Sequence, residues 1–208
     1  PVTGTLLPGP GGQEIDPYEY MGAPDFNAYN TESFALTLLF EQQLSDAFSI
    51  EAVGRYVDSQ ADYRQAWIAF QGNGVPRIDA NGDGTWTFYL ADNRSEQLAI
   101  DARLRGEFST GPIDHELLVG VQRQDVFTDS DTAYLFDGGT LNVFDPTYAG
   151  APTVEQVRQL QGNGPRNYVD STGYYISDQM SLGSLVATAG VRFDDVTNRV
   201  ENGATQKD

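Results

Sequence analysis

The stretch from Ser95 to Gln124 alternates between apolar and polar residues with a period of two, and this pattern most strongly limits the possible folds. One side of its first arm carries Leu98, Ile100, Ala102, Leu104, Gly106 and Phe108, and the other carries Gln97, Ala99, Asp101, Arg103, Arg105 and Glu107. Such alternation gives a strand two faces in contact with different surroundings. The Gly and Pro within residues 110–114 predict a turn, after which residues 115–124 alternate again. We therefore predict a β-hairpin with one apolar face.

The arms of this hairpin are long, and their polar faces carry many charges. A bilayer-spanning strand needs roughly 9–11 residues, whereas strands of soluble domains most often have about 5–6. A register slip of one residue would place Arg103 and Arg105 on the apolar side. At the bilayer midplane this would cost roughly 2–4 kcal/mol for each Arg. These properties favour a transmembrane β-barrel over the alternative, a soluble β-sandwich.

Six strands in three hairpins are predicted along the chain. The apolar positions assigned to the outward face of the other strands include Phe34, Leu36, Leu38, Phe40, Phe48, Ile50, Tyr56, Leu117, Val119, Val121, Tyr174, Ile176, Met180, Leu185, Val191 and Phe193. Short turns at residues 45–47, 109–114 and 181–184 alternate with long segments at 1–30, 60–94, 127–168 and 199–208. An alternative for the outer parts of segment 60–94 is that they prolong the flanking strands beyond the membrane. Outer-membrane barrels have this asymmetry between short turns and long extracellular loops. We therefore predict an all-β fold, an antiparallel up-and-down sheet of about six strands, with residues 1–208 forming one partial barrel domain.

One short helix is expected on the surface of the long segment 127–168. Thr153-Val154-Glu155-Gln156 fits a capping box, Val157 and Leu160 continue an apolar stripe, and Gly162 is a plausible stop. Six strands do not close a barrel of the smallest common size, which has about eight. We therefore expect the chain to be an internal stretch of a longer polypeptide.

Charge and composition exclude several other classes of protein. The formal net charge of −18 results from 30 acidic and 12 basic residues, so a nucleic-acid partner is not expected, because phosphate groups would be repelled. No apolar run approaches the ~18 residues of a membrane helix. Barrel strands leave only a weak hydropathy signal, so this does not exclude the membrane. The chain has no cysteine, and neither a disulfide nor a thiolate metal site is possible.

Four motifs follow one another along nearly the whole chain. They begin with GTLLPGPGGQEIDPYEYMGAPDFNAYNTESFALTLLFEQQLSDAFSIEAVGRY at 4–56 and continue with FSTGPIDHELLVGVQRQ at 108–124, LNVFDPTY at 141–148 and GYYISDQMSLGSLVATAGVRFDD at 173–195. In this order and spacing they resemble TonB-dependent outer-membrane siderophore receptors of the ferrichrome and hydroxamate type. The corresponding family patterns read GTLLPNPNG with GEPDFNRYDR, FxTGxxxHxLLxGVD, xxxYNPVY and GVYxQDQxxLxxLxxxxGxRYD.

The resemblance implies a barrel of about 22 strands whose lumen is filled by an N-terminal plug. In such receptors a ferric siderophore binds on the extracellular side, and TonB supplies energy for import by pulling on the plug. The plug and the TonB-binding segment lie outside this chain. The resemblance therefore implies an outer-membrane location in a Gram-negative bacterium, contact with outer-membrane lipid, and a ferric siderophore of the hydroxamate class as ligand for the parent protein.

Aromatic residues of the long loops are the candidate ligand contacts. A siderophore iron complex is bulky and partly apolar, so an aromatic-lined pocket with some hydrogen-bond donors suits it. By position, the resemblance points to Trp67 and Phe70 on the second loop and to Tyr134 and Phe136 on the third. The alternative is that these rings pack a loop together or form an interfacial girdle.

Residues 79–84 carry oxygen side chains at alternate positions, Asp79, Asn81 and Asp83, followed by Gly84. This matches the first half of a calcium loop. The twelfth position is Leu90 and not a bidentate Glu, so the alternative is a glycine-rich turn with solvated carboxylates.

An enzyme is not expected. The one histidine, His115, follows a short turn in outward phase, with no nucleophile or second base beside it in the sequence. Besides the siderophore receptor, two other functions stay open: a passive outer-membrane porin or sugar channel, and a soluble calcium-binding β-domain. A plug domain upstream would separate the receptor from the porin. A calcium-stabilised monomer without detergent would indicate the soluble domain.

Overall fold

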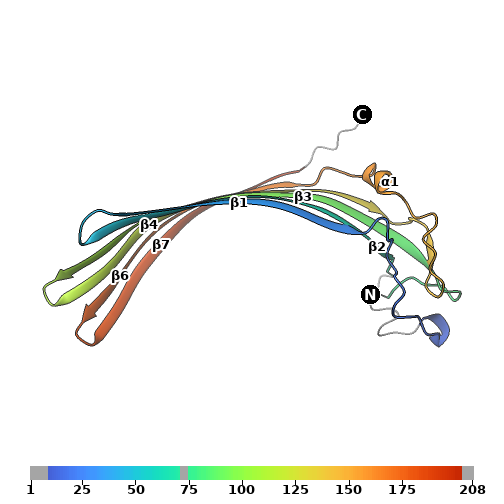
Figure 1. Cartoon of the computed structure of the whole chain (residues 1–208), viewed down its shortest axis with the longest axis horizontal. Coiled ribbons are helices and arrows are strands. Elements are labelled where there is room, and N and C mark those ends of the chain that lie inside the picture. Colours follow the sequence, from blue (N-terminus) through green and yellow to red (C-terminus); the bar gives the residue numbers. More distant parts are fainter. Residues whose placement is uncertain (1–8, 71–74, 203–208) are drawn as a thin grey trace.

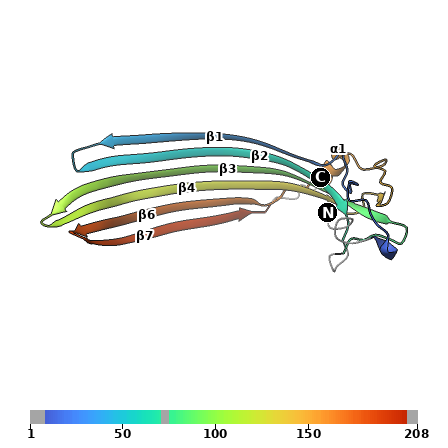
Figure 2. The same cartoon turned by 60° about the horizontal axis from the view of Figure 1, so that its bottom comes forward.

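The computed structural model describes residues 9–70 and 75–202. Its strands are β1 (Ala28–Gln43), β2 (Phe48–Ile68), β3 (Asp83–Thr110), β4 (Ile113–Leu135), β5 (Thr140–Asn142), β6 (Arg166–Leu182) and β7 (Leu185–Glu201), and its helices are η1 (Pro10–Gly12) and α1 (Val154–Arg158). The long strands form one antiparallel sheet in the order β1-β2-β3-β4-β6-β7. This single curved layer confirms the predicted up-and-down sheet of six strands (Figures 1 and 2). The short β5, which pairs with β3, was not predicted.

Two of the short turns contain two residues each, and each begins with a glycine. Gly111 has a φ of 63° and Gly183 a φ of 59°. Residues with a Cβ rarely adopt this left-handed conformation, and two-residue hairpins need it to match the twist of their strands. The turns are tighter than the sequence ranges, because β3 continues to Thr110 and β4 already begins at Ile113.

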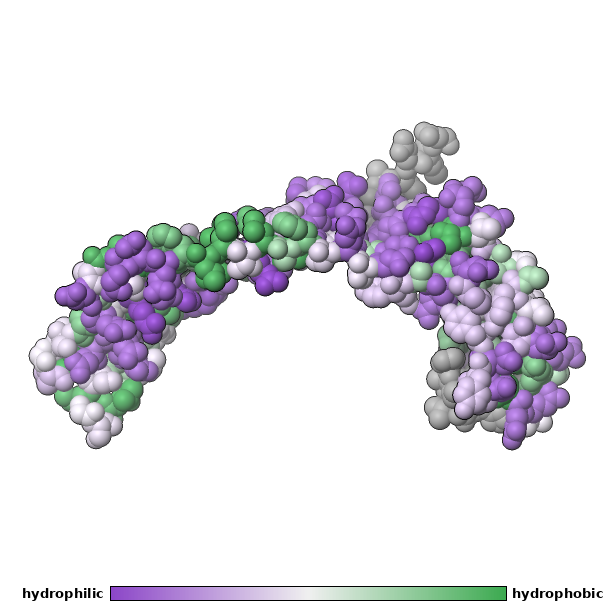
Figure 3. Space-filling view, viewed as in Figure 1, coloured by the Kyte–Doolittle hydropathy of each residue, from purple (hydrophilic) through white to green (hydrophobic). Residues whose placement is uncertain are grey.

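The strand register confirms the predicted division of the sheet into two faces. The residues paired in turn across five strands are Ile50, Leu104, Val119, Ile176 and Val191. Directly paired residues of antiparallel strands point to the same side, so apolar rows of this kind form one face. Hydrophobic residues gather along the convex side of the sheet in the half that contains the short turns (Figure 3).

The concave face carries polar interactions in the same half. Arg103 lies 2.6 Å from the carboxylate of Glu51, and the hydroxyl of Tyr175 donates to the carboxylate of Asp101 at 3.0–3.1 Å. The ring of Tyr175 covers Gly120, where a Cβ would lie only 2.3 Å from it. A polar inner face opposite an apolar outer face is the arrangement that the wall of a membrane barrel requires.

The strands extend well beyond the ends expected from the apolar pattern. β2 runs to Ile68 and β3 begins at Asp83, which confirms the alternative that the outer parts of residues 60–94 prolong the flanking strands. β4 runs to Leu135, into the long segment predicted at 127–168. In these extensions one face changes from apolar to charged. In the middle of the extensions charged side chains alternate with uncharged ones, so hydrophobicity no longer marks the period. At the far end of β3 the same face becomes apolar again, with Trp86, Phe88 and Leu90.

A hydrophobic core lies at the end of the sheet that carries the long loops. Its largest fully buried side chains are those of Trp86, Phe26, Phe88, Leu90, Leu141, Val143 and Val157. Strands β2, β3 and β4 form one side of this core, and residues 9–27 and 136–165 cover it. The half with the short turns contributes no residue to this cluster, so its apolar face is left uncovered by the described residues.

Helix α1 confirms the predicted capping box. The hydroxyl of Thr153 accepts from the backbone N–H of Gln156 at 3.3 Å, and the side chain of Gln156 accepts from the backbone N–H of Thr153 at 2.8 Å. The helix ends at Arg158, before Gly162, and Val157 anchors it in the core. In the described ranges, no helix has the length and apolar character needed to cross a membrane.

Candidate functional site

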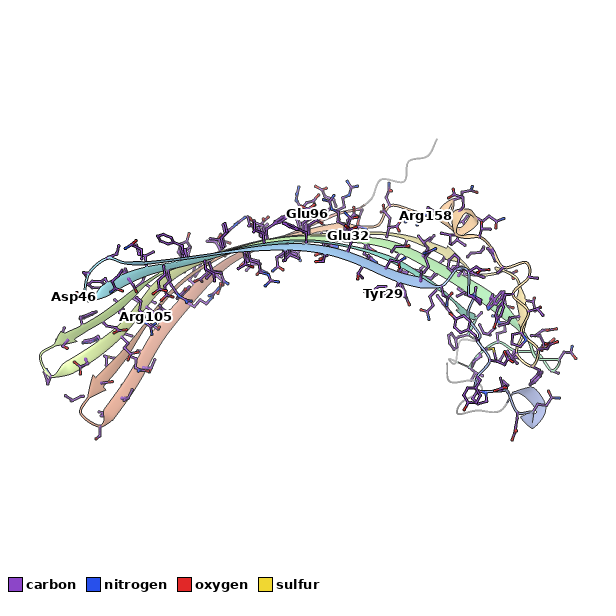
Figure 4. All side chains as sticks on the ribbon, in the orientation of Figure 1. Tyr29, Glu32, Asp46, Glu96, Arg105 and Arg158 are labelled. Carbon is purple, nitrogen blue, oxygen red and sulfur yellow. The ribbon has the colours of Figure 1, made fainter. Side chains whose placement is uncertain are left out.

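Aromatic rings form a row across the concave face at the long-loop end. This aromatic row consists of Tyr29, Tyr63, Trp67, Tyr89, Tyr134 and Phe136. The register pairs Tyr29 with Tyr63 and Tyr89 with Tyr134, so four strands supply rings to one face. Figure 4 shows Tyr29 on the concave side of the sheet.

Neighbouring rings of the aromatic row are in contact. The ring centroids of Tyr29 and Tyr63 are 5.6 Å apart, those of Tyr63 and Tyr89 5.8 Å, and those of Tyr89 and Tyr134 4.6 Å. Phe136 stacks on Tyr134 at 5.4 Å with only 6° between the ring planes. These separations lie in the range in which aromatic pairs attract each other. The row is therefore a continuous surface.

Three of the four aromatic residues predicted from the sequence belong to this row. The ring centroid of Trp67 lies 6.5 Å from that of Tyr89, and Tyr134 and Phe136 form one end of the row. Phe70 lies apart, in an isolated bridge with Pro76 in the β2–β3 connection. It is exposed, and in the part of the chain that the structure describes it forms no ring pair.

Tyr29, Tyr63 and Tyr89 also belong to the row, but they were not predicted as site residues. The signal that identifies them is phase: Tyr63 and Trp67 continue the inward-facing positions of β2, and Tyr89 does so on β3. Extending the period of two beyond the apolar segment would have assigned these rings to the inner face.

The hydrophobic core supports the aromatic row from the opposite face of the sheet. The indole N–H of Trp86 donates to the backbone carbonyl of Met21 at 3.1 Å, and its ring stacks on Tyr148 at 6.3 Å. The ring of Phe88 meets that of Phe26 edge-on at 5.0 Å. Because successive residues of a strand point to opposite faces, these contacts fix the part of β3 that carries Tyr89.

Burial changes the acidity of two tyrosines at this end of the sheet. The pKa of Tyr89 is raised above the ordinary value of 10.0, first by burial and then by the neighbouring Tyr134 and Tyr63. Burial likewise raises the pKa of Tyr148, and Glu19 adds to the effect. Both phenols are therefore uncharged at neutral pH and act as hydrogen-bonding groups.

A groove of about 450 Å³ lies beside the aromatic row, towards the middle of the sheet. Hydroxyl side chains of four strands line it, among them Ser33, Ser59, Ser95 and Thr128. The hydroxyl oxygens of Ser33 and Ser59 are 2.7 Å apart. Rings next to hydroxyl groups suit a bulky, partly apolar ligand that also accepts hydrogen bonds.

The loop around Asp79 forms a turn held by its own hydrogen bonds. One carboxylate oxygen of Asp79 accepts from the backbone N–H groups of Asn81 at 2.8 Å and Asp83 at 2.9 Å. Asn142 donates to Asp83 at 2.8 Å. Within residues 9–70 and 75–202, no three His, Asp or Glu side chains are grouped so that they could hold a metal ion. The calcium site stays a prediction.

His115 lies at the other end of the sheet, beside the turn at Gly111. Its Nδ1 is 2.7 Å from the carboxylate of Asp178, and its Nε2 is 2.7 Å from the hydroxyl of Thr110. Its ring stacks on Phe108 at 5.0 Å. These contacts hold the imidazole on the convex face, at the border of the apolar rows, as its outward phase in the sequence indicates.

The chain matches a known family over nearly its whole length. The family model is described as the β-barrel of TonB-dependent-receptor-like proteins, and it matches residues 2–207. Two relatives are similar in sequence. The ferrioxamine B receptor of Salmonella typhimurium is 26% identical over 197 residues, which are 95% of this chain and 26% of the relative. The ferrichrome outer membrane transporter and phage receptor of Escherichia coli is 23% identical over 232 residues, covering 100% of this chain and 30% of the relative.

Solved structures confirm the fold. The ferric-catecholate import receptor Fiu of Escherichia coli superimposes with a TM-score of 0.76 at 16% identity, covering 99% of this chain and 31% of that receptor. The ferric preacinetobactin receptor BauA of Acinetobacter baumannii superimposes with a TM-score of 0.65 at 16% identity, covering 85% of this chain and 26% of that receptor. The chain thus spans roughly a quarter to a third of the proteins that it matches.

Proposed function

The chain belongs to the TonB-dependent receptor family, in the β-barrel part of that family, and on this premise we propose that it forms part of the wall of an outer-membrane receptor for a ferric siderophore. The proposed ligand is a siderophore of the hydroxamate class, since two relatives that are similar in sequence are named for ferrioxamine B and ferrichrome. Import would use energy from TonB acting through a plug domain. The relatives are receptors and transporters, which favours transport over catalysis and over a passive channel.

The aromatic row on the concave face is the observation that carries this proposal. It combines rings from four strands with the hydroxyl groups of the adjoining groove. In a barrel, the concave side of the wall encloses the lumen, and the long loops mark the extracellular end. We therefore propose that Trp67, Tyr134 and Phe136, together with Tyr63 and Tyr89, contact the ferric complex where it enters. Phe70 is proposed as a more distant loop contact.

The convex face completes the proposal. Its apolar rows would lie against outer-membrane lipid in the half with the short turns, and these turns would face the periplasm. On β3 the apolar positions extend from Leu98 to Phe108, a length that suits the roughly 9–11 residues of a tilted membrane strand.

The experiment is to compare Tyr134→Ala with Tyr168→Ala in the full-length receptor, in outer membranes of the bacterium that produces it. Tyr134 belongs to the aromatic row, whereas Tyr168 points to the convex face, where its ring contacts Phe127 at 5.1 Å. Loss of one ring contact of about 1–1.5 kcal/mol corresponds to roughly a tenfold weaker binding of ferrichrome. We expect this loss for Tyr134→Ala and unchanged binding for Tyr168→Ala. Equal binding by both variants and the parent receptor would contradict the proposed site.

A further inference from the structure

At the long-loop end of the sheet, the charged residues in the segments where the four strands β1 to β4 pair with one another all lie on one face. In residues 28–35, 57–68, 86–97 and 126–135, all charged side chains belong to positions that the register assigns to the convex face. Figure 4 shows Glu32 and Glu96 on this side. Two exposed strands of a soluble protein would not need such a separation, because water on both faces would tolerate charged side chains.

The concave positions of the same segments form a surface that we call the neutral wall. It consists of the odd-numbered residues of 29–35, 57–67 and 87–97 and the even-numbered residues of 126–134. Its side chains are those of Ser, Thr, Asn, Gln, Tyr, Trp, Ala and Val. The neutral wall includes the rings of the aromatic row on β1 to β4 and lines most of the adjoining groove.

Polar groups of the neutral wall bond to one another across strands. The hydroxyl of Ser130 donates to the side-chain oxygen of Asn93 at 2.7 Å, and the side-chain amide of Asn167 on β6 donates to the hydroxyl of Thr128 at 3.4 Å. These groups donate and accept hydrogen bonds without net charge. They can orient a polar ligand, but they cannot neutralise an ionic one.

Ion pairs hold the nearby arginines on the convex side. Arg94 lies 3.6 Å from Asp58 and also contacts Glu96, and Arg166 lies 3.4 Å from Asp129. Arg94 also borders the groove, as do the acidic residues Glu32 and Asp129. Because Arg94 is already paired with two carboxylates, it offers no uncompensated positive charge to a ligand there. Towards the short turns, the nearest positively charged residue on the concave face is Arg55, which is the next concave position of β2 after Val57.

A polyanion placed on the neutral wall would lose hydration without gaining a counter-charge. Desolvating an unpaired charge is far more costly than desolvating a neutral polar group. The chain as a whole carries a net charge of −18, so its long-range field also repels anions. A neutral ferric complex avoids both the desolvation of an unpaired charge and the long-range repulsion, and it still gains the contacts with the rings.

We infer that the neutral wall selects ferric chelates by charge, accepting complexes that are nearly uncharged and rejecting polyanionic ones. Three singly charged hydroxamates cancel the charge of Fe³⁺, whereas three doubly charged catecholates leave a polyanion. The inference rests on the proposed siderophore-receptor function and gives a physical reason for the hydroxamate preference. It also separates this chain from Fiu, whose fold it shares and which is named for ferric catecholates.

The test introduces one positive charge on either face of β2 in the full-length receptor. Ser59→Lys places the charge on the neutral wall, and Gln60→Lys, the matched control, places it one residue further on the convex face. The probes are ferrichrome and a ferric tris-catecholate, and the measured quantity is the ratio of their dissociation constants. One cation near a polyanion should strengthen catecholate binding on the order of tenfold.

The inference predicts that the parent receptor prefers ferrichrome, that Ser59→Lys shifts the ratio on the order of tenfold towards the catecholate, and that Gln60→Lys leaves it unchanged. A parent receptor that binds the catecholate more tightly would overturn the inference and leave the proposed function intact. An unchanged ratio in Ser59→Lys, or an equal shift in Gln60→Lys, would also overturn it. A receptor that binds neither ferric chelate would instead refute the proposed function.

Discussion

Tyr89 occupies the centre of the aromatic row, between the rings of Tyr63 and Tyr134. Burial and these two neighbours raise the pKa of its phenol. At the scale of the residue, this phenol stays protonated at neutral pH and can donate a hydrogen bond from the middle of the aromatic row.

The raised pKa of Tyr89 predicts a dependence on alkaline pH. Its folded-state pKa lies above the unfolded value, so its contribution to stability is fully present below pH of about 10 and is lost as the pH rises through the folded-state pKa. In the full-length receptor, tyrosinate absorbance should show a late-titrating phase, because the pKa values of both Tyr89 and Tyr148 are raised. Its amplitude should fall by one tyrosine in Tyr89→Phe. An unchanged amplitude of the late phase in this variant would contradict the prediction.

At the scale of the strand, the face to which a side chain points determines which substitutions its position tolerates. Leu104 points to the convex face between Ile50 and Val119, whereas Arg103 points to the concave face and pairs with Glu51. Adjacent residues of one strand therefore meet opposite environments, and the consequence of a substitution depends on its phase more than on its position along the strand.

The strand facing predicts unequal effects for two neighbouring substitutions. Leu104→Arg places a charge among the apolar rows, at a cost of roughly 2–4 kcal/mol near the bilayer midplane. Arg103→Leu removes an ion pair that is partly solvated and costs about 1 kcal/mol or less. The amount of heat-modifiable, folded receptor in outer membranes should fall strongly for Leu104→Arg and little for Arg103→Leu. Equal losses would contradict the assignment of the faces.

The sequence predicted the elements best where an apolar period or a capping motif marks them. The hairpin around Gly111, the apolar faces and the capping box of Thr153 were all confirmed. The extensions of β2 and β3 were predicted only as an open alternative and that of β4 was missed, because the two faces differ mainly in charge over the middle of these extensions. The rings of Tyr63 and Tyr89 were missed for the same reason, since only the register across strands brings them together.

At the scale of the whole molecule, one sheet presents four different surfaces, one on each face at each end. The convex face is apolar beside the short turns and charged beside the long loops, where a hydrophobic core stiffens it. The concave face is ionic beside the short turns and neutral and aromatic beside the long loops. The two ends of the sheet therefore differ on both faces, and the proposed ligand entrance lies at the end with the neutral, aromatic concave face.

The central claim, that alternate side chains of β3 meet lipid and a wet interior, is best tested by spin-label accessibility. The chain has no cysteine, so single cysteines at each residue from 97 to 104 can be labelled in the membrane-embedded receptor after replacement of any cysteine outside this stretch. Labels at Leu98, Ile100, Ala102 and Leu104 should be relaxed by oxygen, and labels at the four intervening residues by a water-soluble nickel chelate. Accessibility without this period of two, or with its phase reversed, would contradict the account.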